Sequence, residues 1–186
     1  MCESVVIEIR ETSLLNGDVA KVQKGALDVD WFAGYPNGNK LIGRAEEFFI
    51  SGSSAFQRDK FSKKYTVCTG LVLCGISDGQ PESLLTHQAP FTINDSENGF
   101  TCALRSQFEE NHSSWSQVSA VVFGGRIRDF HSEADRKKKI DMIKEVVADY
   151  FAIDVRVLPP PLKNTALSAF LNNADRVLTL LEEPCV

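Results

Sequence analysis

Few residues of this chain are suited to act as a nucleophile or a base, because its 186 residues include five cysteines and three histidines. Cys68 begins an apolar stretch, and His87 lies nineteen residues further on, beyond the turn signal Asp78-Gly79. If a β-hairpin turns tightly at Asp78-Gly79, His87 falls opposite Gly70, and Cys68 is the next residue on the same face. A longer loop, which the proline after the turn favours, would shift this register.

A thiol beside an imidazole is the arrangement that acyl transfer by nucleophilic catalysis requires. The thiolate attacks a carbonyl carbon, and the imidazole takes the thiol proton and later gives it to the leaving amine. A carboxamide or peptide carbonyl would form a thioester in this way, which water then hydrolyses. In the alternative interpretation, Cys68 is an inert core residue and His87 is a structural histidine held by hydrogen bonds. The residue types alone leave both interpretations open.

Alternating apolar residues and β-branched residues predict the strands that would carry this pair. The strongest strand signals cover residues 65–76 and 83–91, and further strands are predicted at 3–10, 99–108, 118–123, 153–158 and 176–181. A long helix is predicted over 132–151, where apolar residues recur at helical spacing and Ser132 with Asp135 has the outline of a capping box. A short helix is predicted at 166–171.

This order of elements predicts the α+β class. We expect a single layered α/β domain with a mixed, mostly antiparallel sheet or sandwich and one main covering helix. Gly124-Gly125, between the strand at 118–123 and the long helix, is expected to be a tight turn. Cys74 and Cys102 are expected to be packing residues, and His112 and His131 to be surface residues.

The pattern around the pair resembles two related enzyme families. The sequence TVCTGLVL at 66–73, followed by a turn and LLTH at 84–87, is similar to the Cys-then-strand, apolar-x-His pattern of the CheD chemoreceptor glutamine deamidases and the protein N-terminal asparagine amidohydrolases. Downstream, VVFGG at 121–125 before a basic helix and a strand resembles the same succession in those families, and DRVL at 175–178 resembles their last strand. The resemblance covers residues 60–182 and is most specific at Cys68, His87 and Gly124-Gly125.

The resemblance implies a cysteine amidohydrolase fold, a layered domain also seen in the cytotoxic necrotizing factor toxins. The implied reaction is deamidation of a Gln or Asn side chain of a protein substrate, without a cofactor or a metal. Cys68 would be the nucleophile, and His87 the general base and acid. Such families often add a hydroxyl residue before the nucleophile, for which Thr66 fits by strand parity and Ser62 is the other candidate. Residues 61–186 would form the catalytic core of the single domain, after an N-terminal region of undefined role at 1–60.

Composition and charge exclude several other classes of protein. A hydrophobic fraction of 43% excludes global disorder, and a net charge of −5 argues against binding nucleic acid by bulk charge. No apolar run is long enough to span a membrane, and residues 1–10 lack the layout of a secretory signal. The odd number of irregularly spaced cysteines favours free thiols in a reducing compartment, and the paired spacings of a zinc site are absent. We therefore expect a cytoplasmic protein that binds neither membrane nor nucleic acid.

Two alternatives remain to a deamidase that acts on a protein of its own cell. The chain has Thr66-Val67 where CheD proteins usually have Gly-Ser, and the resemblance does not reach residues 1–60. These departures favour a non-catalytic protein-interaction module on the same scaffold, or a bacterial effector that deamidates a host protein. A module of this kind would contact its partner through an aromatic group and a basic helix face, formed by Trp31, Phe32, Tyr35 and residues 136–139.

Overall fold

The structure is a computed structural model that describes residues 6–11, 27–28, 59–97, 99–126 and 132–184. The strands are β1 (Val6–Glu11), β2 (Leu27–Asp28), β3 (Lys60–Tyr65), β4 (Thr69–Ser77), β5 (Gln80–Leu85), β6 (Trp115–Gly124), β7 (Val155–Val157), β8 (Thr165–Asn172) and β9 (Val177–Pro184). The α-helices are α3 (Phe100–Asn111) and α4 (Glu133–Phe151), and two short 3-10 helices are η2 (Pro90–Thr92) and η3 (His112–Ser114). The aromatic group at 31, 32 and 35 and His131 lie outside the described residues.

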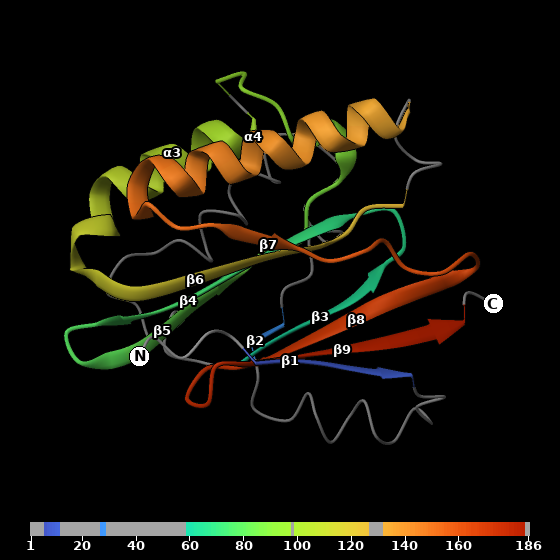
Figure 1. Cartoon of the computed structure of the whole chain (residues 1–186), viewed down its shortest axis with the longest axis horizontal. Coiled ribbons are helices and arrows are strands. Elements are labelled where there is room, and N and C mark those ends of the chain that lie inside the picture. The colour runs from blue at the N-terminus through green and yellow to red at the C-terminus, as the bar shows by residue number, and fades with distance from the viewer. Residues whose placement is uncertain (1–5, 12–26, 29–58, 98, 127–131, 185–186) are drawn as a thin grey trace.

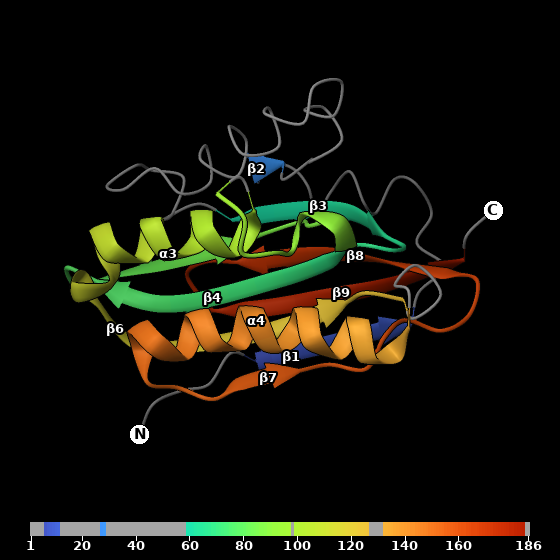
Figure 2. The same cartoon turned by 90° about the horizontal axis from the view of Figure 1, so that it is seen from above.

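These elements form three layers, in which two β-sheets lie face to face and the two α-helices cover the outer face of one sheet (Figure 1). Seen from above, α3 and α4 lie side by side along that sheet (Figure 2). The predicted α+β class is confirmed, and of the two predicted arrangements, a single sheet or a sandwich, the structure has the sandwich. The covering layer contains α3 in addition to the long helix that the sequence predicts.

Each sheet mixes parallel and antiparallel pairs. Within the described residues the five-stranded sheet has the strand order β1-β9-β8-β3-β2, and the sheet that the helices cover, called the covered sheet, has the order β5-β4-β6-β7. In the covered sheet β4 pairs antiparallel with both β5 and β6, and only the β6–β7 pair is parallel. In the other sheet β8 pairs antiparallel with β3 and β9, while β1 and β2 add at the edges as parallel strands.

The β4–β5 hairpin has the tight turn on which the predicted site depends. Ser77 pairs with Gln80, so Asp78 and Gly79 are the two turn residues. Both have positive φ, 50° and 76°, as a type I′ turn requires at its two central positions. Pro81 fits the ladder because β5 is an edge strand of its sheet. The tight-turn register is therefore confirmed, and the longer loop is not formed.

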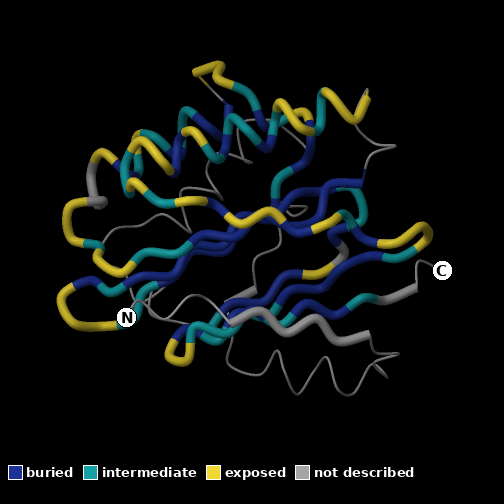
Figure 3. The backbone as a smooth tube through the Cα atoms, viewed as in Figure 1, coloured by how far each residue is buried: buried dark blue, intermediate teal, exposed yellow. Residues whose placement is uncertain are grey.

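Two separate apolar cores stabilise the layers. One lies between the sheets and combines residues of the covered sheet, such as Val72, Leu85 and Val121, with Leu171 and Leu180 of the other sheet. The second lies between the covered sheet and the two helices. Alternate residues of β4 belong to alternate cores, so this strand is buried on both faces along almost its whole length (Figure 3). Its end is thus a well-fixed position for a functional group.

The predicted helix at 132–151 is confirmed as α4. The hydroxyl of Ser132 accepts a hydrogen bond from the N–H of Asp135 at 3.1 Å, which caps the first turn. The side chains of Ile140, Ile143 and Val147 are buried against the sheet. The helix therefore has one face fixed on β6 and β7, and its first turns lie where β6 ends (Figure 2).

Two predicted elements are wrong. Residues 99–108, predicted as a strand, form most of α3. Phe100, Leu104 and Phe108 recur every fourth residue, so their side chains share one face of the helix, which is buried against the covered sheet. Residues 166–171, predicted as a short helix, belong to β8. That strand is central in its sheet, and pairing on both sides with β3 and β9 outweighs the helical preference of its alanine and leucine residues.

Candidate active site

Cys68 lies in the short connection between β3 and β4. Residues 66 and 67 form a bend, and β4 begins at Thr69. Cys68 is 1% exposed and belongs to the core between the two sheets. Its side chain therefore lies inside the sandwich, at the end of the covered sheet where β4 starts.

His87 lies just beyond β5, where the chain continues the pairing of the hairpin. Thr69 and Gln88 exchange two backbone hydrogen bonds, each 2.8 Å long. In this register His87 is opposite Gly70, and Cys68 is the next residue on the same face, as the sequence predicts. His87 is also nearly covered, with 2% of its surface exposed. Such diagonal neighbours are within reach of each other's side chains, so the fold brings the thiol and the imidazole to one buried location.

Two residues of β3 hold the imidazole from the opposite sheet. The hydroxyl oxygen of Ser62 lies 2.8 Å from Nδ1 of His87, and both groups are buried. The ring of Tyr65 stacks on the imidazole with centroids 4.0 Å apart and planes inclined by 18°. The Tyr65 hydroxyl donates to the carbonyl of Thr86 at 2.8 Å, which fixes the tyrosine in turn. A hydrogen bond at one nitrogen and a stacked ring on one face together orient His87.

A second aromatic residue closes this part of the site. Phe123 of β6 meets the Tyr65 ring edge to face, with centroids 4.8 Å apart. Phe123 pairs with Gly70, and a Cβ placed on Gly70 would lie 2.3 Å from the phenyl ring. Because Gly70 has no side chain, the Phe123 ring can lie over Gly70, which separates Phe123 from His87 across the sheet. The sequence pattern included Phe123 only within the VVFGG resemblance and gave neither Tyr65 nor Phe123 a role at the site, although each is an aromatic residue at a strand end.

Burial sets the protonation states of the site. Burial lowers the pKa of His87 to about 3, so the imidazole is uncharged at neutral pH. Burial raises the pKa of Tyr65; its hydrogen bond with Ser62 opposes this, and the nearby Cys68 adds to it. The resting site thus contains a neutral imidazole and a neutral phenol. An uncharged imidazole is the form that can accept a proton, and a pKa of about 3 makes the buried His87 a much weaker base than a free imidazole.

The structure assigns no tight turn to Gly124-Gly125: Gly124 ends β6 and pairs with Thr69, and the two glycines hold the backbone of Cys68. Both glycines have positive φ, 80° and 72°. The N–H of Gly125 donates to the carbonyl of Cys68 at 2.9 Å. A Cβ on Gly124 would lie 2.5 Å from the same carbonyl oxygen, so only glycine permits this approach. The Gly125 N–H is therefore engaged by Cys68.

The structure separates the two hydroxyl candidates. The parity argument for Thr66 assumes an unbroken strand, but β3 ends at Tyr65 and Thr66 lies in the bend that follows, half-buried. The hydroxyl placed against His87 is that of Ser62, the other candidate. Sequence patterns do not distinguish the two, because the contact joins residues on different sheets.

A second buried polar network, which no sequence pattern indicates, joins β3 to β5. The ammonium group of Lys60 donates to the hydroxyl of Ser83 at 2.9 Å, and this hydroxyl donates to Oδ1 of Asn173 at 2.6 Å. Burial lowers the pKa of Lys60 to about 7, against the opposing influence of Cys74 and two nearby carboxylates. Cys74 is buried in the intersheet core, and burial raises the pKa of its thiol to about 12. Its position agrees with the packing role expected from the sequence.

Comparison of the chain with models of protein families, with curated proteins and with solved structures finds no match in any of the three. Within the part of the chain that the structure describes, no three His, Cys, Asp or Glu side chains come together as a potential metal site. Among the same residues, no helix has both the length and the apolar character needed to cross a bilayer. The function of the chain is therefore inferred from the geometry around Cys68 and His87.

Proposed function

We propose that this protein is a cysteine-dependent amidohydrolase that deamidates a Gln or Asn side chain of a protein substrate. The observation that carries the proposal is the buried hairpin end, where Ser62 orients His87 and Cys68 is the next residue on the same face. The resemblance of residues 66–87 to the CheD deamidases supports a carboxamide as the substrate. Burial lowers the pKa of His87 to about 3, so the role of general base requires an opening of the site that raises this pKa.

The reaction uses only groups of this site. The sulfur of Cys68 forms a bond to the carboxamide carbon while its proton passes to His87, which gives a tetrahedral intermediate. Collapse of the intermediate breaks the C–N bond, and His87 returns the proton to the nitrogen, which leaves as ammonia. Water then attacks the thioester with His87 as base, and the carboxylic acid and the thiol are released. Ser62 holds the imidazole through each of these proton transfers.

Access to the site is part of the proposal. Cys68 and His87 are 1% and 2% exposed, so a carboxamide reaches them only when the chain that covers them moves aside. Closure around the substrate would keep bulk water from the reacting atoms until the thioester has formed. The described cysteines, Cys68, Cys74 and Cys102, are free thiols, which supports a reducing, cytoplasmic location.

The experiment that tests the proposal is thiol labelling followed by a deamidation assay. Iodoacetamide labelling across pH, mapped by mass spectrometry, is expected to modify Cys68 in the native chain at a rate that depends on His87. The purified protein is then incubated with Gln-containing and Asn-containing peptide pools, and release of ammonia and conversion of amide to acid are measured. Cys68→Ser is expected to abolish deamidation, while Cys102→Ser, half-buried on α3, is the matched control. Full activity in Cys68→Ser overturns the proposal.

The covering of both groups is also the observation that favours a second candidate, a non-catalytic protein-interaction module. In that case Cys68 is a core residue, and the exposed Lys137 and Lys138 of α4 contribute to a surface for an acidic partner. Labelling distinguishes the two candidates. A Cys68 that reacts only after unfolding, together with unchanged peptide pools, supports the module and excludes the amidohydrolase.

A further inference from the structure

The basic run at the start of α4 divides into two pairs of side chains. Lys137 and Lys138 are exposed, whereas Arg136 and Lys139 are half-buried. Residues three apart lie on the same side of a helix, so Arg136 and Lys139 point toward the same part of the molecule. That part is the end of the covered sheet, where Cys68 and the chain after His87 lie.

Arg136 reaches the two glycines at the end of β6 that hold Cys68. Its Nε donates to the carbonyl of Gly125 at 2.5 Å, and one of its terminal nitrogens donates to the carbonyl of Gly124 at 3.3 Å. The N–H of Gly125 in turn donates to the carbonyl of Cys68 at 2.9 Å. The guanidinium therefore bridges two successive carbonyls at the end of β6, and the N–H of the second of these residues binds the carbonyl of Cys68. A planar fork suits this pair of acceptors, and a lysine amine at the same position lacks the second arm.

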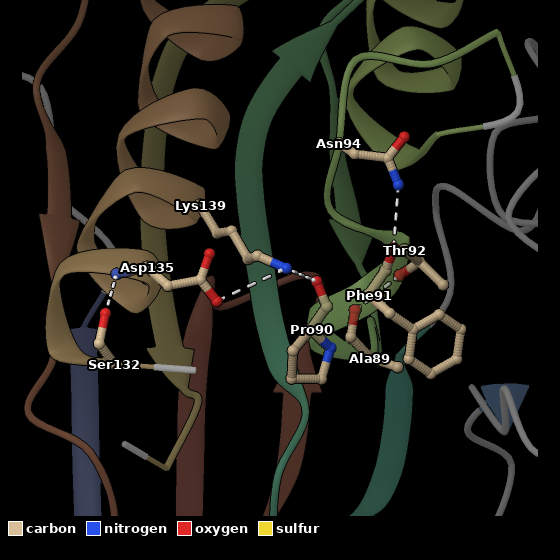
Figure 4. A network of polar contacts seen from close by, with 8 residues as sticks. All are labelled: Ala89, Pro90, Phe91, Thr92, Asn94, Ser132, Asp135 and Lys139. Atoms are coloured by element: carbon tan, nitrogen blue, oxygen red, sulfur yellow. Dashed lines mark hydrogen bonds and ion pairs between the residues drawn. The ribbon is translucent and has the colours of Figure 1, made fainter. Parts of the chain in front are cut away.

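Lys139 reaches the part of the chain that follows His87. Its ammonium group donates to the carbonyl of Pro90 at 2.6 Å and lies 3.8 Å from a carboxylate oxygen of Asp135 (Figure 4). Pro90 opens η2, three residues after His87. The same turn is closed by Thr92, whose hydroxyl and N–H both donate to the carbonyl of Ala89, at 2.8 and 3.0 Å. Lys139 therefore ties the turn that follows His87 to α4.

We propose that Arg136 and Lys139 are positioning residues that together hold Cys68 and His87 in register from one helix. Arg136 acts on the Cys68 side through Gly124 and Gly125, and Lys139 acts on the His87 side through Pro90. This inference rests on the proposed function, since it assigns the two cations to the alignment of the catalytic pair. Both cations act through backbone carbonyls beside the pair.

The test measures how strongly the reactivity of Cys68 depends on His87 in different backgrounds of the full-length chain. Iodoacetamide labelling of Cys68 at neutral pH is compared with and without His87→Ala, in the native chain, Arg136→Ala, Arg136→Lys, Lys139→Met and Lys138→Gln. In the native chain and in Lys138→Gln, we expect removal of His87 to slow the labelling of Cys68 about tenfold. In these proteins the imidazole is correctly placed to act on the thiol, and that action depends steeply on position. In Arg136→Ala and Lys139→Met the same removal is expected to change the rate less than about twofold. Arg136→Lys is expected to recover part of the coupling.

The outcomes separate this inference from the proposed function. If the native chain shows no dependence on His87, the proposed catalytic pair and its positioning both fail. If the native chain shows the dependence and the Arg136 and Lys139 variants keep it in full, only the positioning role fails. Thermal unfolding of each variant is recorded alongside, because a purely structural role would lower the melting temperature without removing the coupling between Cys68 and His87.

Discussion

The hydroxyl of Ser62 lies 2.8 Å from Nδ1 of His87, and this contact crosses from one sheet of the sandwich to the other. Ser62 belongs to β3 of the five-stranded sheet, while His87 continues the hairpin of the covered sheet. The site is therefore assembled by the packing of the two sheets, and its geometry depends on their separation and register.

Removal of the Ser62 hydroxyl is expected to weaken the action of His87 on Cys68 strongly and to lower the stability of the fold only slightly. In Ser62→Ala, His87 loses the partner that orients it, so His87-dependent labelling of Cys68 should fall on the order of tenfold. The lost hydrogen bond should lower the free energy of unfolding by about 1 kcal/mol. Thr66→Val is the matched control, with an expected change in labelling below about twofold. A larger effect of Thr66→Val than of Ser62→Ala would reassign the hydroxyl role to Thr66.

Acid is expected to destabilise the fold through His87. Burial lowers the pKa of His87 to about 3, below the ordinary value of 6.5 that an unfolded chain has. Between these values the unfolded chain binds a proton that the folded chain excludes, so stability falls by about 1.4 kcal/mol for each pH unit of decrease. Urea unfolding of the native chain and of His87→Gln from pH 7 to pH 4 measures this slope. Equal slopes in the two proteins would contradict the assignment to His87.

Lys60 is expected to make the protein more stable at alkaline pH. Its pKa is lowered to about 7 by burial, from 10.5, so the folded state favours the neutral amine. Protonation penalises the fold fully below pH 7, and this penalty is removed as pH rises toward 10.5. The free energy of unfolding should therefore rise between pH 7 and pH 10.

Lys60→Met should flatten this rise, since a neutral side chain has no charge to desolvate. The control is Lys63→Met, which removes an exposed lysine of the same strand and should leave the pH dependence unchanged. Urea unfolding at a series of pH values provides the comparison. A Lys60→Met protein with the full native pH dependence would show that another group is responsible.

Alanine substitutions at Gly79 and Gly124 distinguish the cost of backbone strain from the cost of a steric contact with Cys68. Gly124 and Gly79 have similar positive φ, 80° and 76°, so alanine strains the backbone at both positions. A Cβ meets the Cys68 carbonyl at 2.5 Å on Gly124 and meets nothing within 4 Å on Gly79. Gly79→Ala should cost about 1 kcal/mol of stability, and Gly124→Ala should cost more than about twice that. Chemical unfolding measures both, and equal losses would show that the contact with Cys68 is unimportant.

The parts of the site that sequence analysis predicted are those governed by local rules. Asp78-Gly79 specifies a two-residue turn, and that turn alone determines that His87 falls opposite Gly70. The capped helix at 132–151 follows from Ser132 and from apolar spacing. The wrong assignments arose where local pattern was ambiguous, as at residues 166–171, whose alanine and leucine residues suit either a helix or a buried strand.

The sequence by itself determined the α+β class, the hairpin register and the placement of Cys68 and His87 on one face, because each follows from turn chemistry and residue periodicity. Only the tertiary structure decided that Ser62 and Tyr65 hold the imidazole, that Arg136 and Lys139 reach the ends of the pair, and that Lys60 is buried. These contacts join elements far apart in the chain. Their partners are selected by the packing of one layer on another, and no periodicity within a single strand or helix encodes that choice.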